Sequence, residues 1–410
     1  MMINFKFVLI WFLSFTFVIN ATVELGVDRF FKDGFNELIR NKKIGIVTNQ
    51  TGVDSNLKST INIFIDNATN YKVQALFAPE HGLDGKEYAG EKIKNTNWGK
   101  DIHVYSLHGE TRRPTKEMLD GLDVIIYDIQ DIGCRSYTYC TTLFYVIEEA
   151  AKYNITVIVL DRPNPINGII VDGPMIQELF RSYVGYINVP YCHGMTIGEL
   201  AILFNKEYKI GCNIKVVQMH GWDRKMSFKE TKLNWIPTSP QMPESDTPYF
   251  YASTGILGEL GIVNIGVGYT LPFKVVGAPW IDADLFAKNL NQQKLPGVLF
   301  VPFHYRPFYG SYKEKTCHGV LIKITDEHVY KPLTVQYCLI GILKTLYKKE
   351  VLSKLTILSQ SKRDMFNKVN GNDVIFKYLI NEQYPSWKLI EFQKNDRQNF
   401  LKIREKYLLY

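Results

Sequence analysis

A glutamate and a histidine lie in a short turn that follows one of the apolar segments of the chain. Residues 77–82 read Phe-Ala-Pro-Glu-His-Gly, so Glu80 and His81 stand between a proline and a glycine, which favour rigid turns. A carboxyl group at the end of a buried strand is partly desolvated, and desolvation raises its pKa towards the range of a general acid. The alternatives are that Glu80 caps a neighbouring helix and that His81 is structural.

A second segment concentrates hydrogen-bonding side chains between positions 127 and 139. It carries, in order, Asp128, Gln130, Asp131, Arg135, Tyr137 and Tyr139. Carboxylates and amides bind hydroxyls, Arg pairs with carboxylates, and Tyr stacks on rings. This density suits a polyhydroxylated ligand. The alternative is a helix N-cap formed by Asp131, with Arg135 as its ion-pair partner.

Short apolar segments precede both groups and are predicted to form a parallel sheet. They are residues 43–48, 72–77, 103–106, 124–128 and 156–160. Their apolar character indicates burial on both faces, and helical segments at 58–65 and 142–152 alternate with them. Ligands of such sheets bind beyond the carboxyl ends of the strands. Polar residues follow nearly every predicted strand, at 49–51, 79–82, 107–109, 128–131 and 161–165, which predicts a site at that edge.

The second half of the chain has a different pattern. A helix over 195–208 and a strand over 215–219 precede a proline-rich, irregular stretch at 222–251. We therefore expect one domain at 22–246 and a second at 247–410. Strands at 298–305 and 319–325, with helices at 283–292 and 334–348, favour a smaller α+β domain. The predicted fold class is α/β, with a doubly wound, mostly parallel sheet followed by this smaller domain.

Composition and the N-terminus limit the class of protein. The 410 residues are 46% hydrophobic and 22% charged, which is typical of globular proteins and excludes a disordered chain. The net charge of +7 is spread along the chain, so nucleic acid is not an expected partner. Residues 1–21 combine a basic start, an apolar run at 7–19 and a small residue at 21. They predict an export signal, and the alternative is an uncleaved anchor.

Common cofactor motifs are missing from the sequence. No G-x-G-x-x-G follows the first predicted strand, no P-loop or G-x-S-x-G occurs, and no C-x-x-C indicates a zinc site. The six cysteines are expected to be mostly buried small residues. One S-x-x-K, from Ser55 to Lys58, leaves serine acyl-transfer chemistry as a minor alternative.

Several motifs, in order along the chain, resemble the exo-β-N-acetylmuramidase family of the NamZ type. They are Ala-Pro-Glu80-His81-Gly, Asp128-Ile-Gln130-Asp131-Ile-Gly-x-Arg135-x-Tyr137-Thr-Tyr139, Asp161-Arg162-Pro-Asn164-Pro, His193-Gly-Met-Thr-x-Gly-Glu199, Pro237-Thr-Ser-Pro-Gln241-Met-Pro and Gly277-Ala-Pro-Trp280. The resemblance implies a Rossmann-like domain, a smaller C-terminal domain and a site between them. It implies an exported, periplasmic or secreted glycosidase that releases N-acetylmuramic acid from non-reducing ends of peptidoglycan fragments, without a metal or nucleotide cofactor.

The resemblance also implies roles for individual residues. Glu80 corresponds to the proposed catalytic glutamate and is expected to act as general acid. The oxocarbenium-like transition state needs a second carboxylate or the 2-acetamido oxygen of the substrate. The candidates for the second carboxylate are Asp131 and Asp128, followed by Glu259. Substrate binding is expected from His81, Gln130, Arg135, Tyr137, Tyr139, Asp161, Arg162, Asn164, His193, Gln241 and Glu259.

One departure from the family pattern affects substrate choice. Gly266-Val267-Gly268-Tyr269 stands where family members usually carry Gly-Arg-Gly-Thr, and Gln241 replaces an expected Asn. Muramic acid carries a lactyl carboxylate, which a cation has to recognise. The candidates are Arg135, Arg162, Arg112 and Arg113, of which Arg135 is predicted to be the selector. The alternatives to muramic acid release are a non-catalytic muropeptide-binding protein and exo-release of a disaccharide.

Overall fold

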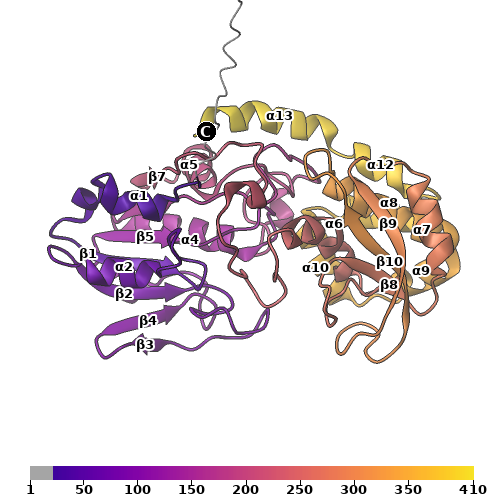
Figure 1. The fold of residues 1–410 in the computed structure, drawn as a ribbon, viewed down its shortest axis with the longest axis horizontal. Helices are drawn as coiled ribbons and strands as arrows, with labels where there is room; N and C mark the ends of the chain where they lie inside the picture. The colour runs from indigo at the N-terminus through magenta and orange to yellow at the C-terminus, as the bar shows by residue number, and fades with distance from the viewer. Residues whose placement is uncertain (1–21) are drawn as a thin grey trace, which may run out of the picture.

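The computed structural model describes residues 22–410, and the predicted export signal at 1–21 lies outside this range. The described chain contains a seven-stranded sheet in its first half and a three-stranded sheet in its second half. Figure 1 shows the two sheets in separate lobes, each with its own helices. The predicted order, a doubly wound α/β domain followed by a smaller α+β domain, is confirmed.

The large sheet is parallel except at one edge. Its order is β3-β4-β2-β1-β5-β6-β7, and β3 runs antiparallel to β4. The six predicted strands are present with bounds within two residues of expectation, whereas β3 was not expected. The strands are β1 (Lys43–Thr48), β2 (Lys72–Ala78), β3 (Thr96–Trp98), β4 (Ile102–Ser106), β5 (Val124–Asp128), β6 (Thr156–Leu160) and β7 (Ile214–Val217).

The central strand β1 pairs with β2 on one side and with β5 on the other. Val47 lies opposite both Phe77 and Tyr127, and Thr48 lies opposite Asp128. Because these registers align the carboxyl ends, the loops after β2 and β5 leave the sheet at the same edge. The two segments that carry the candidate catalytic residues are therefore neighbours in space.

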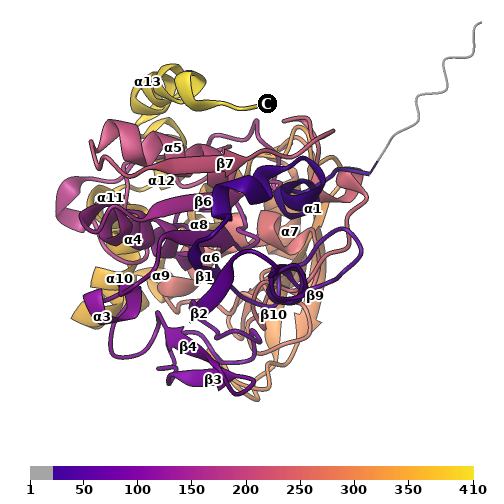
Figure 2. The same ribbon diagram turned by 90° about the vertical axis from the view of Figure 1, so that its left-hand side faces the viewer.

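Helices cover both faces of the large sheet. They are α1 (Gly26–Lys32), α2 (Thr60–Asp66), α3 (Lys116–Leu119), α4 (Thr138–Lys152) and α5 (Ile197–Glu207), with 3-10 turns η1 (Phe35–Ile39), η2 (Glu178–Phe180) and η3 (Phe228–Thr231). Phe30 of α1 and Phe64 of α2 pack with Ile46 in one core. Leu143 of α4 and Phe204 of α5 belong to the core on the opposite face. Figure 2 shows α1 and α4 on opposite sides of the strands.

The C-terminal domain is an antiparallel sheet, in the order β8-β10-β9, surrounded by helices. The stretch expected to be irregular ends early, because a helix begins at Thr247. Four further helices and a helical turn after residue 356 were not predicted. The elements are α6 (Thr247–Glu259), β8 (Val275–Ala278), α7 (Ala283–Asn291), β9 (Val298–Tyr305), β10 (Cys317–Ile324), α8 (Pro332–Leu346), α9 (Lys348–Thr356), α10 (Gln360–Asn370), α11 (Val374–Asn381), α12 (Pro385–Glu391), α13 (Lys394–Arg404) and η4 (Glu405–Tyr407).

The last helix returns to the N-terminal domain. Figure 1 shows α13 passing from α12 towards α5. A guanidinium nitrogen of Arg404 donates to the carbonyls of Gly168 and Gly194, and the Tyr410 hydroxyl donates to Asp161 at 2.7 Å. These contacts, together with a hydrophobic core that spans both domains, hold the two domains against each other.

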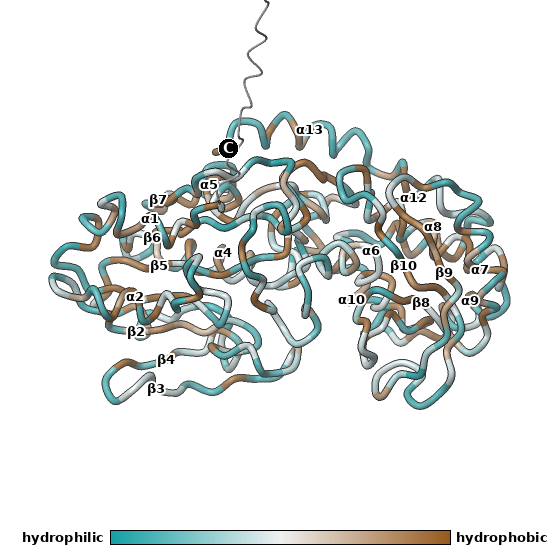
Figure 3. Tube along the Cα trace, viewed as in Figure 1, coloured by the Kyte–Doolittle hydropathy of each residue, from teal (hydrophilic) through white to brown (hydrophobic). Residues whose placement is uncertain are grey.

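Hydropathy follows this architecture. Figure 3 shows hydrophobic segments in the strands and in α8, and hydrophilic segments along the outer loops and α13. All six cysteines are free thiols, and each of them is buried, as expected for small apolar residues. Among residues 22–410, no helix combines the length and the apolar character needed to cross a membrane.

Candidate active site

Glu80 lies in a tight turn directly after β2. His81 has a φ of 71° and Gly82 a φ of 81°, so two consecutive left-handed residues turn the chain away from the sheet. A left-handed backbone is unusual for a residue with a side chain. The ring nitrogen Nδ1 of His81 lies 2.7 Å from the carbonyl oxygen of Glu87, which ties down the following loop. His81 therefore has the structural role that was the alternative for it.

Three neighbouring groups surround the Glu80 carboxylate. The Thr138 hydroxyl donates to Oε2 at 2.6 Å, and the Gly90 amide donates to Oε1 at 2.9 Å. Nε2 of His108, which follows β4, lies 3.6 Å from Oε1. Thr138 is the first residue of α4, so the carboxylate also faces the positive end of a helix. The side chain is 11% exposed, which leaves part of it accessible to a ligand.

These neighbours change the protonation of Glu80. Burial raises its pKa, but hydrogen bonds from Thr138 and Gly90 and the imidazole of His108 outweigh burial, so the pKa lies below its usual value. The rise in pKa predicted from desolvation alone is therefore wrong for the ligand-free protein. Burial lowers the pKa of His108, which favours its neutral form. Glu80 is thus a carboxylate before a substrate binds.

Aromatic rings lie beside this carboxylate. The Tyr183 ring lies 5.7 Å from the His108 ring, and the Tyr137 and Tyr139 rings meet edge to face at 4.9 Å. The Tyr137 hydroxyl hydrogen-bonds the Thr238 hydroxyl at 2.8 Å, and the Tyr139 hydroxyl donates to the Thr238 carbonyl at 2.6 Å. Tyr139 is fully buried, so it supports the site rather than stacking on a sugar.

Three residues of this site were not predicted as functional: His108, Thr138 and Tyr183. His108 had a detectable signal, because it follows a predicted strand at the same edge of the sheet as Glu80. Thr138 lies in the polar segment at 127–139, between Tyr137 and Tyr139, and its residue type alone gives no functional signal. Tyr183 stands in a long loop between β6 and α5 and carried no local signal.

Asp131 is a second carboxyl group near the start of α4. Its Oδ1 accepts hydrogen bonds from the amides of Ile132 at 2.7 Å and Gly133 at 2.9 Å. Its Oδ2 is buried and has no hydrogen-bond partner among the described residues. Burial raises the pKa of Asp131 to about 7. Burial also raises the pKa of Tyr137, and the charges of Asp131 and Glu80 add to this effect.

Replacement of Asp131 by Asn is expected to change how stability depends on pH. The folded-state pKa of about 7 lies above the unfolded value of roughly 3.9, so the folded protein binds more protons between these values. The wild type should therefore lose stability as pH rises from about 4 to 7, and Asp131→Asn should lose less. Melting temperatures measured at pH 5 and pH 8 test this. Equal losses in the two proteins would contradict the raised pKa.

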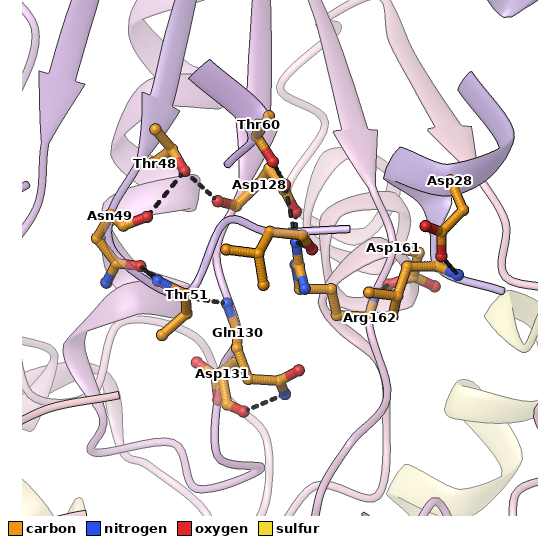
Figure 4. Close-up of polar contacts among 12 residues, drawn as sticks. Asp28, Thr48, Asn49, Thr51, Thr60, Asp128, Gln130, Asp131, Asp161 and Arg162 are labelled. Atoms are coloured by element: carbon orange, nitrogen blue, oxygen red, sulfur yellow. Dashed lines mark hydrogen bonds and ion pairs between the residues drawn. The ribbon is translucent and has the colours of Figure 1, made fainter. Parts of the chain in front are cut away.

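Asp128 is fully engaged in a buried ion pair. Nε of Arg162 donates to its Oδ1 at 2.5 Å, Nη2 of Arg162 donates to its Oδ2 at 2.8 Å, and the Thr60 hydroxyl also donates to Oδ2. Figure 4 shows this network, with Asp131 and Gln130 apart from it. Asp128 is completely buried and Arg162 is 4% exposed. The structure thus removes Asp128 as a catalytic candidate and Arg162 as a substrate-binding one.

Asp161 anchors the start of α5. It accepts hydrogen bonds from the Thr196 hydroxyl at 2.7 Å, the Gly198 amide at 2.8 Å and the Tyr410 hydroxyl at 2.7 Å. Burial raises the pKa of Asp161 to about 6, and these donors oppose the rise. With its carboxylate occupied by protein donors, Asp161 is a structural residue rather than the predicted ligand contact.

Three more predicted site residues hydrogen-bond the loops at this edge of the sheet, namely Gln130, Asn164 and His193. Gln130 Nε2 donates to the carbonyls of Asp131 and Pro163, and Asn164 Nδ2 donates to the Met195 carbonyl at 3.0 Å. Nδ1 of His193 accepts a hydrogen bond from the Met195 amide. Burial lowers the pKa of His193 to about 3, so this imidazole is neutral. All three side chains thus hydrogen-bond the protein backbone, whereas the sequence predicted that they contact a sugar.

Arg135 does not reach the site. Its side chain is almost fully buried, and its guanidinium donates to four backbone carbonyls, those of Pro174, Val189, Val369 and Asn370. Two of these carbonyls belong to α10 in the other domain. Arg135 therefore joins the two domains, and the prediction that it selects the lactyl carboxylate is wrong for geometric reasons.

Gln241 belongs to the loop before α6, and Glu259 belongs to the C-terminal end of this helix. Gln241 Nε2 donates to the Tyr309 hydroxyl at 2.6 Å, in the loop after β9. Glu259 is the last residue of α6, and burial raises its pKa. The altered segment after it forms a tight turn, in which Asn264 donates to the Val267 carbonyl and accepts from the Gly266 amide. These two hydrogen bonds hold the backbone of the turn within the C-terminal domain.

The serine acyl-transfer alternative finds no support. The Ser55 hydroxyl donates to Asp28 at 3.0 Å, and the Lys58 ammonium pairs with Asp66 at 2.7 Å. The two side chains therefore have separate partners and do not form a nucleophile and base. Within residues 22–410, no group of three or more His, Cys, Asp or Glu side chains is arranged to hold a metal ion.

Comparisons with known proteins agree with this architecture. Residues 44–246 match the family model of the exo-beta-N-acetylmuramidase NamZ N-terminal domain, and residues 249–410 match that of its C-terminal domain. The chain is 37% identical over 389 residues to the peptidoglycan beta-N-acetylmuramidase NamZ of Bacillus subtilis, covering 95% of this chain and 91% of that protein.

Solved structures show the same fold. A DUF1343 family protein from Bacteroides fragilis superposes with a TM-score of 0.88 at 39% identity, and a second one with a TM-score of 0.72 at 27% identity. In both cases the match covers 95% of this chain and 99% of the other.

Proposed function

Because the chain belongs to the exo-β-N-acetylmuramidase NamZ family, we propose that it is a glycosidase that releases N-acetylmuramic acid from the non-reducing ends of peptidoglycan fragments. The observation that carries the proposal is the likeness to a peptidoglycan beta-N-acetylmuramidase over both domains and 95% of the chain. A partly accessible carboxylate at the carboxyl edge of the sheet, beside aromatic rings, supplies the chemistry that this reaction needs.

In this proposal Glu80 exchanges the proton with the glycosidic oxygen. The carboxylate is held in one orientation by Thr138 and Gly90, which positions it for directed proton transfer. A bound sugar displaces water from Glu80, and the added desolvation raises its pKa towards that of an acid. After the leaving group departs, the resulting carboxylate is the base that activates the attacking water.

Asp131 is the proposed second carboxyl group. It shares the N-terminal end of α4 with Glu80, since the Cys140 amide also interacts with it. Its pKa near 7 and its unpartnered Oδ2 distinguish it from the saturated Asp128. Two carboxyl groups whose environments move their pKa values in opposite directions are the usual signature of divided roles in a glycosidase. The 2-acetamido oxygen of the substrate is the alternative source of this assistance.

The reaction is tested by mass spectrometry of products from defined, alternating oligosaccharides that end in N-acetylmuramic acid. We expect free N-acetylmuramic acid and an oligosaccharide shortened by one sugar. Accumulation of a disaccharide would contradict single-sugar release. Binding measured by calorimetry without any product would identify the chain as a glycan-binding protein instead.

We also propose that the protein is exported, because residues 1–21 have the layout of a signal peptide and peptidoglycan lies outside the cytoplasm. N-terminal sequencing of the native protein should find a mature chain that begins near Thr22. A chain that retains Met1 in the soluble cytoplasmic fraction would contradict export.

A further inference from the structure

The substrate of the proposed reaction requires a cation close to Glu80. N-acetylmuramic acid differs from N-acetylglucosamine by a lactyl ether on C3, which ends in a carboxylate. When this sugar is the one released, its C3 lies only two bonds along the ring from the carbon that reacts. A residue that recognises the lactyl carboxylate therefore has to lie within about one side-chain length of the catalytic carboxyl group.

Three of the four arginines near this edge of the sheet are already occupied. Arg135 is buried and donates to four backbone carbonyls. Arg162 is buried in its ion pair with Asp128. Arg113 pairs with Glu148 at 2.6 Å and stacks on a tyrosine ring. None of these guanidinium groups can bind a substrate carboxylate without leaving a carboxylate or several carbonyls unpaired.

Arg112 is in a different situation. Its side chain is exposed, and within residues 22–410 it has neither a hydrogen bond nor an ion pair in the structure. Its guanidinium carbon lies 4.1 Å above the centre of the Tyr183 ring. Stacking on a ring orients the guanidinium plane but uses none of its N–H donors, so the edge remains available for a two-point contact with a carboxylate.

Contacts link Arg112 to the catalytic group. Tyr183, which carries the guanidinium, packs against His108 at 5.7 Å between ring centres. Nε2 of His108 in turn lies 3.6 Å from Oε1 of Glu80. Burial lowers the pKa of His108, and the positive charge of Arg112 adds to this effect, so the two groups are within electrostatic reach. The Tyr183 ring thus contacts both the Arg112 guanidinium and the ring of His108, the histidine that faces Glu80.

We propose that Arg112, held in place by stacking on Tyr183, binds the lactyl carboxylate of the sugar that Glu80 releases. This inference rests on the proposed function, because it names the group that distinguishes muramic acid from glucosamine. It replaces Arg135 as the selecting residue.

The test compares the binding of N-acetylmuramic acid and of its methyl ester, which has the same shape without the charge. Isothermal titration calorimetry of the wild type should show that the acid binds about ten- to a hundred-fold more tightly than the ester. Arg112→Met should bind both ligands equally. Arg112→Lys should keep part of the preference, because an ammonium retains the charge but lacks the planar fork.

Arg181→Met is the matched control. Arg181 also stacks on a tyrosine ring, at 3.9 Å above Tyr186, but its ion-pair partners Glu148 and Glu178 hold it there. This variant should keep the full preference for the acid. Melting temperatures of all variants verify that they are folded.

Two results would overturn the inference. One is a wild type that binds acid and ester equally, and the other is an Arg112→Met variant that retains the preference. The second result would transfer the role to Lys92 or Lys94, exposed lysines of the loop that pairs with the backbone of His108. Failure of the proposed function is recognised separately, because it appears as the absence of released muramic acid from glycans, whereas the ligand comparison needs no turnover.

Discussion

Replacement of Glu80 by Gln is expected to lower the rate of glycan hydrolysis by about 10²–10⁴-fold. The amide has nearly the same shape and still accepts a hydrogen bond from Thr138 or Gly90, so the fold should persist. It has no acidic proton to give to the leaving oxygen. Release of N-acetylmuramic acid from a natural disaccharide, followed by chromatography, measures the loss.

A second substrate shows whether the loss comes from missing proton donation or from weaker substrate binding. An aryl leaving group with a low pKa needs little protonation, so an aryl N-acetylmuraminide should be affected much less than the natural disaccharide. Glu110→Gln is a suitable control, because Glu110 is exposed and follows β4 close to the site in sequence. Natural glycan cleaved by Glu80→Gln at nearly the wild-type rate would show that another group is the acid.

Replacement of Asp128 by Asn is expected to reduce the free energy of unfolding by about 3–5 kcal/mol. The change removes the carboxylate that, within residues 22–410, alone pairs with Arg162, whose guanidinium stays buried within 2.8 Å of the altered side chain. An unpaired buried charge is costly because water cannot solvate it. Urea denaturation should show a lower midpoint with an unchanged slope.

Turnover distinguishes this structural role from a catalytic one. The folded fraction of Asp128→Asn should keep a kcat close to that of the wild type, because neither oxygen of Asp128 is available to a substrate. Asp66→Asn is the matched control, since Asp66 pairs with Lys58 at the surface and such pairs contribute about 0–1 kcal/mol. A stable Asp128→Asn protein without activity would return Asp128 to the catalytic candidates.

The sequence by itself determined the sheet and the edge at which the chemistry is located. Strands such as β1 and β5 were predicted with their exact bounds, because a short run of buried apolar residues between turn residues is a local signal. The same rule led to Glu80 and Asp131, since both follow strands that neighbour the central strand β1. The strand β3 was not predicted, because its three residues are too few to show a periodic pattern, and the helices after residue 356 were not predicted either.

Only the tertiary structure decided which polar residues serve the ligand and which serve the fold. The sequence favoured Arg135 over Arg112, because Arg135 shares a segment with Asp131. In the structure, however, Arg135 binds carbonyls 234 and 235 positions away, whereas Arg112 is exposed and stacks on Tyr183. Asp128 and Asp131 also differ, because Asp128 pairs with Arg162 inside the protein, whereas Oδ2 of Asp131 has no hydrogen-bond partner among the described residues. The physical reason is that burial and pairing depend on contacts between distant segments, which determine whether a charge is neutralised inside the protein or left available to a substrate.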